Sequence, residues 1–245
     1  MSKIYVVGIG PGEYEQMTIK AANALKNCDI IVGYTVYVDL VKEHFADKEF
    51  LTTPMRQEVE RCRLCFEKAL EGKNVAMICS GDAGVYGMAG LMYEISEEFD
   101  NSNIDIEIIP GVTAALGGAS VLGAPLIHDF AVISLSDLLT PWEKIEARLK
   151  AAAASDLVVC LYNPSSRKRK DYLKRACEYL LENKSADTVC GYVRNIGREG
   201  ECFELCTLGE LKDRQVDMFT TVFVGNEQTK IIDGHMVTPR GYRYE

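Results

Sequence analysis

The stretch Val6-Val-Gly-Ile-Gly-Pro-Gly12 runs an apolar strand directly into a turn made of glycine and proline. The apolar, β-favouring run that begins at Ile4 is typical of a parallel strand covered on both faces. The three glycines remove side chains where the backbone must approach a neighbour closely or take a positive φ, and Pro11 fixes the turn. The sequence therefore predicts a buried first strand that ends at a ligand-binding edge.

A dinucleotide-binding loop begins in a similar way, but two of its features are missing here. The Rossmann fingerprint has a third glycine three positions after the second and an acidic residue at the end of the next strand. Glu13 occupies that third position, and the next predicted strand ends in Gly33 and Tyr34. These differences disfavour an NAD-dependent dehydrogenase. A tight turn without any ligand remains an alternative at this point.

Composition restricts the class of protein. The 245 residues suffice for one α/β domain or for two of about 120 residues. The net charge of -9 argues against a nucleic-acid partner, so an anionic substrate would need a local basic site. No apolar run is long enough to span a membrane, and no leader-like segment opens the chain. Nine cysteines, an odd number, lie mostly in apolar patterns, so we expect reduced thiols and a soluble, cytoplasmic protein.

Short apolar strands alternate with helical patterns along the chain, as in a parallel α/β architecture. A glycine- and alanine-rich helix is predicted over 113–122, and Gly123-Ala124-Pro125 follows it as a hinge. We therefore expect an N-terminal α/β domain over 1–112 and a C-terminal α/β domain over 113–245. Further helices are predicted over 18–27, 57–71, 86–98, 141–152 and 171–183. The predicted strands are 4–9, 29–33, 49–53, 75–79, 105–109, 130–134, 157–162, 188–193, 202–207 and 220–224, with 202–207 as an antiparallel edge strand.

Two more turns of small residues follow predicted strands. Ser80-Gly-Asp-Ala-Gly-Val-Tyr-Gly87 follows the strand 75–79 and is expected to open a helix, and Pro110-Gly-Val-Thr-Ala114 follows the strand 105–109. Open α/β sheets bind ligands at the carboxyl ends of their strands, where backbone N–H groups are available. Three such turns together favour a ligand site over tight turns that bind no ligand.

A run of four cations, Arg167-Lys-Arg-Lys170, follows Tyr162-Asn163-Pro164 at the start of a predicted helix. Cations at a helix N-terminus oppose the helix dipole, and each costs about 0.3 kcal/mol. A solvated charge run is one explanation. In so acidic a chain we favour recruitment of an anionic ligand, to which Arg194 and Arg198 would add further cations.

Other catalytic and metal patterns are weak. Cys62-x-x-Cys65 lies in a helical stripe and Cys202-x-x-x-Cys206 alternates within a strand, whereas structural zinc pairs usually come from turns, so no resident metal is expected. No serine lies in a Gly-x-Ser-x-Gly elbow, which disfavours an acyl-transfer triad. His128-Asp129, beside the hinge, is a candidate proton-transfer pair. A histidine that is simply hydrogen-bonded at the domain junction is the alternative.

In order along the chain, Gly8-x-Gly10-Pro11-Gly12, Ser80-Gly-Asp82, Pro110-Gly-Val-Thr-Ala114 and Thr220-Thr-Val-Phe-Val-Gly225 resemble the tetrapyrrole methyltransferase family. Two longer stretches, His128-Asp-Phe-Ala-Val-Ile-Ser-Leu-Ser-Asp-Leu-Leu-Thr-Pro-Trp142 and Leu161-Tyr-Asn-Pro-Ser-Ser-Arg-Lys-Arg169, are similar to its precorrin-3B C17-methyltransferase branch. The resemblance covers essentially the whole chain. It implies two α/β domains of the tetrapyrrole methylase type with mixed sheets, S-adenosylmethionine in the cleft between them, and a homodimer.

The same resemblance implies an activity and the residues that serve it. The activity is methylation of precorrin-3B or cobalt-precorrin-3 at C17, with ring contraction, in cobalamin biosynthesis; any cobalt would be carried by the substrate. Asp82 would orient amino or ribose groups of the cofactor. The acetate and propionate arms of the substrate would pair with Arg167, Lys168, Arg169, Arg194 and Arg198. The implied cofactor contacts, mostly through backbone, are Pro11, Ser80, Gly81, Asp82, Val85, Thr113, Ala114, Tyr162, Asn163 and Val193.

A proton-transfer group would come from His128, Asp129, Asp137 or Tyr34. Tyr34 stands where the related uroporphyrinogen methyltransferases have an aspartate, so their acid–base pair need not be shared. Ala83 stands where many relatives carry proline. Two alternatives remain: a sibling methyltransferase that acts at another corrin carbon, and a non-catalytic tetrapyrrole- or nucleotide-binding module.

Overall fold

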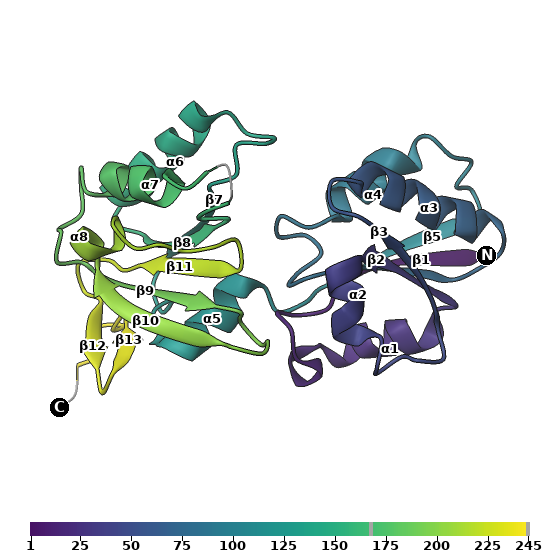
Figure 1. The fold of residues 1–245 in the computed structure, drawn as a ribbon, viewed down its shortest axis with the longest axis horizontal. Coiled ribbons are helices and arrows are strands. Elements are labelled where there is room, and N and C mark those ends of the chain that lie inside the picture. Colours follow the sequence, from purple (N-terminus) through teal and green to yellow (C-terminus); the bar gives the residue numbers. More distant parts are fainter. Residues whose placement is uncertain (167–168, 244–245) are drawn as a thin grey trace. The chain divides into compact units, whose positions relative to one another are not determined.

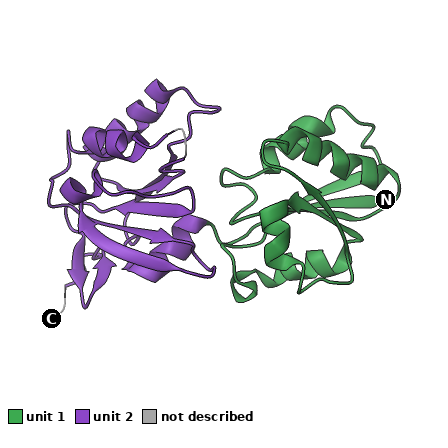
Figure 2. Cartoon of the chain, viewed as in Figure 1, with its two compact units in different colours: residues 1–113 green, residues 114–245 purple. Residues whose placement is uncertain are grey.

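A computed structural model describes residues 1–166 and 169–243. The chain forms two compact units, Met1–Thr113 and Ala114–Glu245, drawn in different colours in Figure 2. Each unit is built around its own five-stranded sheet. Arg167 and Lys168, two of the predicted substrate-binding cations, lie outside the described residues.

The sheet of the first unit is entirely parallel, with the order β3-β2-β4-β1-β5. Helices α3 and α4 cover one face of this sheet and α1 and α2 the other (Figure 1). Side chains of β1 alternate between the two layers: Ile4 and Val6 pack toward α3 and α4, and Val7 toward α1 and α2. The elements are β1 (Ser2–Gly8), η1 (Tyr14–Gln16), α1 (Ile19–Asn27), β2 (Ile30–Tyr34), α2 (Thr35–Val41), β3 (Glu49–Thr53), α3 (Glu58–Leu70), β4 (Val75–Cys79), α4 (Ala89–Ser96) and β5 (Ile104–Ile109).

Two helix starts in this unit show how local chemistry sets the boundaries. Thr18 caps α1, because its hydroxyl accepts a hydrogen bond from Ala21 N–H at 3.1 Å. The helix predicted to begin at Tyr86 begins instead at Ala89, and Tyr86 itself has a left-handed φ of 53°. The loop after β4 is therefore longer than predicted and does not open directly into a helix.

The second unit contains a mixed sheet with the order β10-β9-β11-β8-β7, in which only β7 and β8 run parallel. The strand β10 is an antiparallel edge strand, as predicted. The expectation of mixed sheets thus holds for this unit, whereas the first sheet is purely parallel. Helices α6, α7 and α8 pack on one face and α5 on the other. The elements are α5 (Ala114–Leu122), β6 (Gly123–Ala124), β7 (Phe130–Ser134), α6 (Trp142–Ala154), β8 (Val158–Tyr162), α7 (Tyr172–Leu180), β9 (Val189–Arg194), β10 (Cys202–Thr207), α8 (Leu208–Leu211), β11 (Thr220–Val224), β12 (Lys230–Ile232) and β13 (His235–Val237).

A small third sheet, β12-β13-β6, completes the second unit. Across residues 1–166 and 169–243, no helix combines the length and the apolar character needed to cross a lipid bilayer.

Candidate functional site

The three turns of small residues in the first unit meet at one edge of its sheet. They follow β1, β4 and β5, and these strands are neighbours in the order β4-β1-β5. Gly10 N–H donates to Gly81 O at 3.0 Å, and Gly81 N–H donates to Gly10 O at 2.7 Å. The turns are therefore joined backbone to backbone at the carboxyl ends of the strands, where α/β sheets bind ligands.

Glycine is required at this junction because the backbones touch. A Cβ placed on Gly111 would lie 2.1 Å from Gly81 O, and one placed on Gly8 would lie 2.7 Å from Gly111 N. Gly10 and Gly81 also have left-handed φ values of 78° and 70°. No other residue type could occupy Gly8 or Gly111 without separating the loops.

Asp82 holds this junction together with hydrogen bonds from three backbone amides. Its Oδ1 accepts from Gly84 N–H at 2.8 Å and from Val85 N–H at 3.0 Å. Its Oδ2 accepts from Gly111 N–H at 2.9 Å, across the gap between two loops. Because both carboxylate oxygens are engaged with the backbone, Asp82 organises the loops, a role that sequence reasoning missed.

The remaining candidates of the first unit lie around this junction. Pro11 is buried in the first loop, Ser80 and Thr113 are half-buried, and Val85 is exposed on the loop after β4. Tyr34 ends β2, the neighbour of β4, and its ring lies edge-on to that of Tyr37 at a centroid distance of 5.3 Å. The structure thus brings the predicted cofactor residues of this unit, together with Tyr34, to one edge of one sheet.

The second unit has a comparable edge at the ends of β7, β8 and β9. The hydroxyl of Tyr162 accepts a hydrogen bond from Ala115 N–H at 2.6 Å, so β8 is tied to the first turn of α5, which Ala114 opens. Asn163 has a left-handed φ of 53°, and its amide donates to Ser134 Oγ at 2.9 Å. Strained backbone of this kind is frequent at ligand sites.

Val193 differs from the other candidates at this edge. It is fully buried in the core, and its backbone lies in register with Phe203 on one side and Thr221 on the other. Its place within the sheet makes it a support for the strand end rather than a side chain presented to a ligand.

Asp137 is fixed in the loop that follows β7. Arg169 Nε lies 2.6 Å from its Oδ1, and the Tyr172 hydroxyl donates to its Oδ2 at 2.5 Å. The hydrogen bond from Tyr172 and the charge of Arg169 lower the pKa of this carboxyl group below its usual range. The same contact raises the pKa of Tyr172. Asp137 is thus a carboxylate that stays ionised at neutral pH.

The predicted cations are partly engaged within the chain. Arg169 is bound to Asp137, and Arg194 Nε lies 2.8 Å from Asp217 Oδ2 in a well-exposed pair. Arg198 lies in the turn after β9, where its N–H donates to Asn195 O at 2.9 Å. Exposed pairs such as Arg194–Asp217 contribute little stability, so they can exchange partners at little cost.

His128 and Asp129 lie at the other end of the second sheet. They directly precede β7, whose first residue pairs with Val158 and whose last pairs with Tyr162. The structure therefore places them a strand length away from Tyr162 and Asn163. With Ser155, Asp156, Leu157, Asn226 and Gln228 they line a shallow pocket, in which His128 Nε2 is buried without a hydrogen-bond partner among the described residues.

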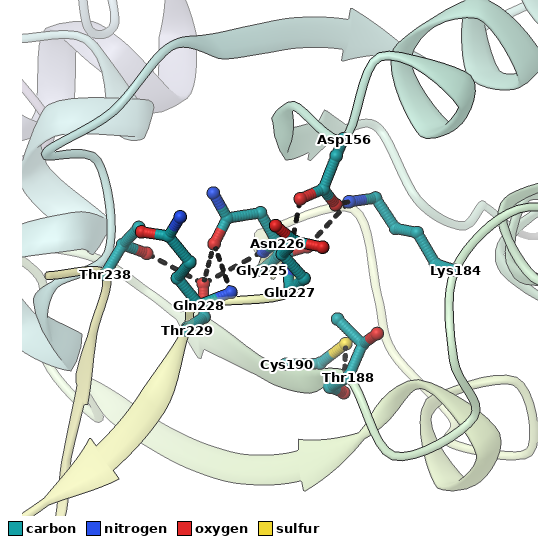
Figure 3. Close-up of polar contacts among 10 residues, drawn as sticks. All are labelled: Asp156, Lys184, Thr188, Cys190, Gly225, Asn226, Glu227, Gln228, Thr229 and Thr238. Atoms are coloured by element: carbon teal, nitrogen blue, oxygen red, sulfur yellow. Dashed lines mark hydrogen bonds and ion pairs between the residues drawn. The ribbon is translucent and has the colours of Figure 1, made fainter. Parts of the chain in front are cut away.

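A buried polar network borders this pocket (Figure 3). The buried Lys184 amine donates to Asp156 Oδ1 at 2.8 Å and to Gly225 O at 3.0 Å. Thr229 Oγ1 in turn lies 2.8 Å from Thr238 Oγ1. The Lys184 bonds join the segments that follow α6, α7 and β11, and the threonine bond joins the residues that flank β12 and β13. These polar residues therefore have a structural role at this end of the unit.

The cysteines are free thiols, and all but Cys202 are buried. Burial raises the pKa of Cys62 to about 12 and that of Cys79 to about 11, which keeps these thiols protonated. Within the described ranges, no three His, Cys, Asp or Glu side chains are grouped as a metal site requires.

Comparison with known proteins places this architecture in a family. A model of the tetrapyrrole (corrin/porphyrin) methylases matches residues 3–212. A Salmonella typhimurium protein named probable cobalt-factor III C(17)-methyltransferase is 50% identical over 237 residues, which are 97% of this chain and 98% of the relative. A Sinorhizobium protein named precorrin-3B C(17)-methyltransferase is 37% identical over 246 residues, covering 98% of this chain and 96% of the relative.

Solved structures agree. The crystal structure of the methyltransferase CobJ superimposes with a TM-score of 0.90 at 33% identity and covers 98% of this chain and 100% of its own. A uroporphyrin-III C-methyltransferase from Thermus thermophilus, solved in complex with S-adenosylhomocysteine, has the same fold, with a TM-score of 0.70 at 22% identity over 91% of this chain and 97% of that one.

Proposed function

The chain belongs to the tetrapyrrole (corrin/porphyrin) methylase family, and we propose that it transfers a methyl group from S-adenosylmethionine to C17 of precorrin-3B or its cobalt-containing counterpart, with ring contraction, in cobalamin biosynthesis. The observation that carries this proposal is the 50% identity, over nearly the full length of both chains, to a protein named for C17 methylation of cobalt-factor III. The 37% identity to the protein named for precorrin-3B supports the same carbon but a metal-free substrate.

The residues present suit S-adenosylmethionine as methyl donor. When bound, this cofactor supplies an electrophilic methyl group on a sulfonium, and the protein's task is mainly to position it. In the first unit, the close backbone contacts of Gly8, Gly81 and Gly111 hold the three loops together, and Ser80, Val85 and Thr113 lie on these loops. In the second unit, Ala114, Tyr162 and Asn163 offer one apolar and two polar contacts. We propose these residues as the cofactor contacts, with Asp82 as the group that sets the loop geometry.

Two of the four proton-transfer candidates are supported by their positions. Asp137 and Tyr34 lie at carboxyl strand ends, as the proposed cofactor residues of their units do. We propose the Tyr34 hydroxyl as a proton donor. The lowered pKa of Asp137 makes it a weak base, so we propose that it holds Arg169 and Tyr172 in place at this strand end. His128 and Asp129 lie at the amino end of β7, and we assign them no part in the chemistry.

Replacement of His128 by asparagine is expected to change kcat/KM by no more than about twofold, because the side chain is a strand length from the proposed site. Tyr34→Phe, which removes the proposed proton donor, should lower kcat by about 100-fold, the usual range for a lost acid–base group. Steady-state methyl transfer from labelled S-adenosylmethionine measures both variants. A large fall in kcat for His128→Asn with an unchanged melting temperature would return His128 to the catalytic set.

The function itself is tested by incubating the purified chain with S-adenosylmethionine and, in parallel, with precorrin-3B and cobalt-factor III. We expect the product mass to increase by one methyl group and the absorption spectrum to change to that of a contracted ring with at least one substrate. The substrate that reacts identifies the pathway branch. Methylation at another carbon, located by NMR of the product, would show a sibling methyltransferase. Tight cofactor binding without turnover on either substrate would favour a binding module.

We further propose a homodimer in the cytoplasm. The free thiols favour a reducing compartment. Phe203, Met218 and Phe219 are each about half exposed, and their neighbours Cys202 and Thr220 both pair with Arg194, so these apolar side chains gather at one end of the sheet. Sedimentation velocity of the wild type and of the double variant Phe203→Ser with Phe219→Ser tests whether two copies of the chain associate through these side chains. A wild type that sediments as a monomer at micromolar concentration would refute it.

A further inference from the structure

Two neighbouring leucines are conspicuously exposed on the loop between β7 and α6. The exposed fraction is 63% for Leu138 and 98% for Leu139, more than for any other adjacent apolar pair in the described part of the chain. Burial of a leucine side chain is worth about 1.5–3 kcal/mol relative to exposure. A single exposed leucine is ordinary, but packing within the unit gives no reason for two in succession.

The loop that presents them is held in place. Asp137, the preceding residue, is bound by Arg169 and Tyr172, and Ser136 N–H donates to Ser134 Oγ at 3.2 Å. On the other side, Pro141 is the N-cap residue of α6, which begins at Trp142. Because contacts fix both ends of the loop, the two exposed leucines lie on an ordered loop.

The surroundings of the pair combine apolar surface with positive charge. The loop leaves the carboxyl end of β7, and the amide of Asn163 bonds to Ser134 at its base. Arg169 contacts Asp137 directly, Lys170 is exposed, and the Arg175 guanidinium lies 4.0 Å from the Trp142 ring centroid. An apolar contact flanked by cations suits a flat, largely apolar ligand that bears carboxylate arms.

We propose that Leu138 and Leu139 are the apolar contact for one face of the tetrapyrrole macrocycle, and that Asp137, Arg169 and Tyr172 position them. The identity of the ligand rests on the proposed function. The contact discriminates among substrates by the shape of the ring face, whereas the cations bind its arms. It also explains why the pair lies at the same strand end as Tyr162 and Asn163 and not elsewhere on the surface.

The test measures binding without turnover. Cobalt-factor III is titrated into the full chain saturated with S-adenosylhomocysteine, and quenching of the single tryptophan, Trp142, reports the complex. The double variant Leu138→Ser with Leu139→Ser should bind about 10-fold more weakly, while its affinity for S-adenosylhomocysteine, measured by calorimetry, stays the same. Leu138→Met with Leu139→Met should retain wild-type affinity, because methionine preserves an apolar surface of similar volume.

A matched control is Ile231→Ser with Ile232→Ser on β12, whose side chains are 52% and 41% exposed in the same unit. It should bind cobalt-factor III as the wild type does. Equal affinity of the leucine variant and this control would overturn the proposal, as would a leucine variant that also loses S-adenosylhomocysteine. A wild type that binds but never methylates would refute the proposed function alone, leaving the leucine contact to be judged by these affinities. A wild type that binds no tetrapyrrole would refute both.

Discussion

Replacement of Gly111 by alanine is expected to destabilise the first unit by about 3 kcal/mol and to weaken S-adenosylhomocysteine binding by at least about 100-fold. The added Cβ would lie 2.1 Å from Gly81 O and 2.6 Å from Gly8 C, both of which are backbone atoms. These atoms cannot move without breaking the paired turns after β1 and β4. Chemical unfolding followed by circular dichroism, together with calorimetric titration of the cofactor product, measures the two effects.

Gly90→Ala is the matched control in the same unit. Gly90 lies inside α4, and a Cβ placed on it meets nothing within 4 Å outside its own helix. Alanine there should stabilise the chain by about 0.5–1 kcal/mol, because it restricts the unfolded state and favours helix. If the stability and the S-adenosylhomocysteine affinity of Gly111→Ala equal those of the wild type, the turns are not in the close contact described above.

Replacement of Asp82 by alanine is expected to cost about 2–3 kcal/mol of stability and to weaken S-adenosylhomocysteine binding by about 100-fold. Three amides lose their acceptor, including Gly111 N–H, which Asp82 links to a second loop. Asp82→Asn should have an intermediate effect, because it keeps one acceptor oxygen but turns an N–H₂ group toward an N–H donor. Melting curves and calorimetric titration measure both variants.

The Asp82→Ala variant also separates two possible roles for Asp82. If it organises the loops, stability and cofactor affinity fall together; if it instead touches the cofactor, affinity falls while stability is preserved. Asp39→Ala is a suitable control, since Asp39 is an exposed carboxylate of the same unit that pairs with Lys42 at 2.7 Å. It should leave both quantities unchanged.

The strands of the two large sheets could be predicted closely because most are short apolar runs between glycine, proline or polar residues, and others, such as β5 and β10, alternate apolar and polar residues. Smaller elements escaped prediction. The helix α2 follows β2 without a break, and its N-terminal flanking residue, Tyr34, makes no side-chain cap. The strands β6, β12 and β13 have only two or three residues each. The short helix α8 could have been found, because Thr207 and Glu210 form the capping box that their spacing indicates.

The site was only partly accessible from the sequence. The glycines indicated close backbone approaches, but not that the loops after β1, β4 and β5 meet, since strand order is set by long-range packing. The hydrogen bond from Gly111 N–H to Asp82 depends on the same order, whereas those from Gly84 and Val85 are local. The position of His128 was foreseeable: it precedes the predicted strand 130–134, and ligand-binding edges lie at the carboxyl ends of strands.

The distribution of thiols gives this protein a natural handle for labelling. Cys202 alone is exposed, while burial raises the pKa of Cys28 and Cys206 to about 11 and keeps the other thiols out of reach of reagents. Cys202 pairs across the strands with Arg194, one of the cations proposed to receive a carboxylate arm. A maleimide dye would therefore modify the wild-type chain at one position, and its emission would report the arrival of an anionic ligand beside it, with no engineered cysteine.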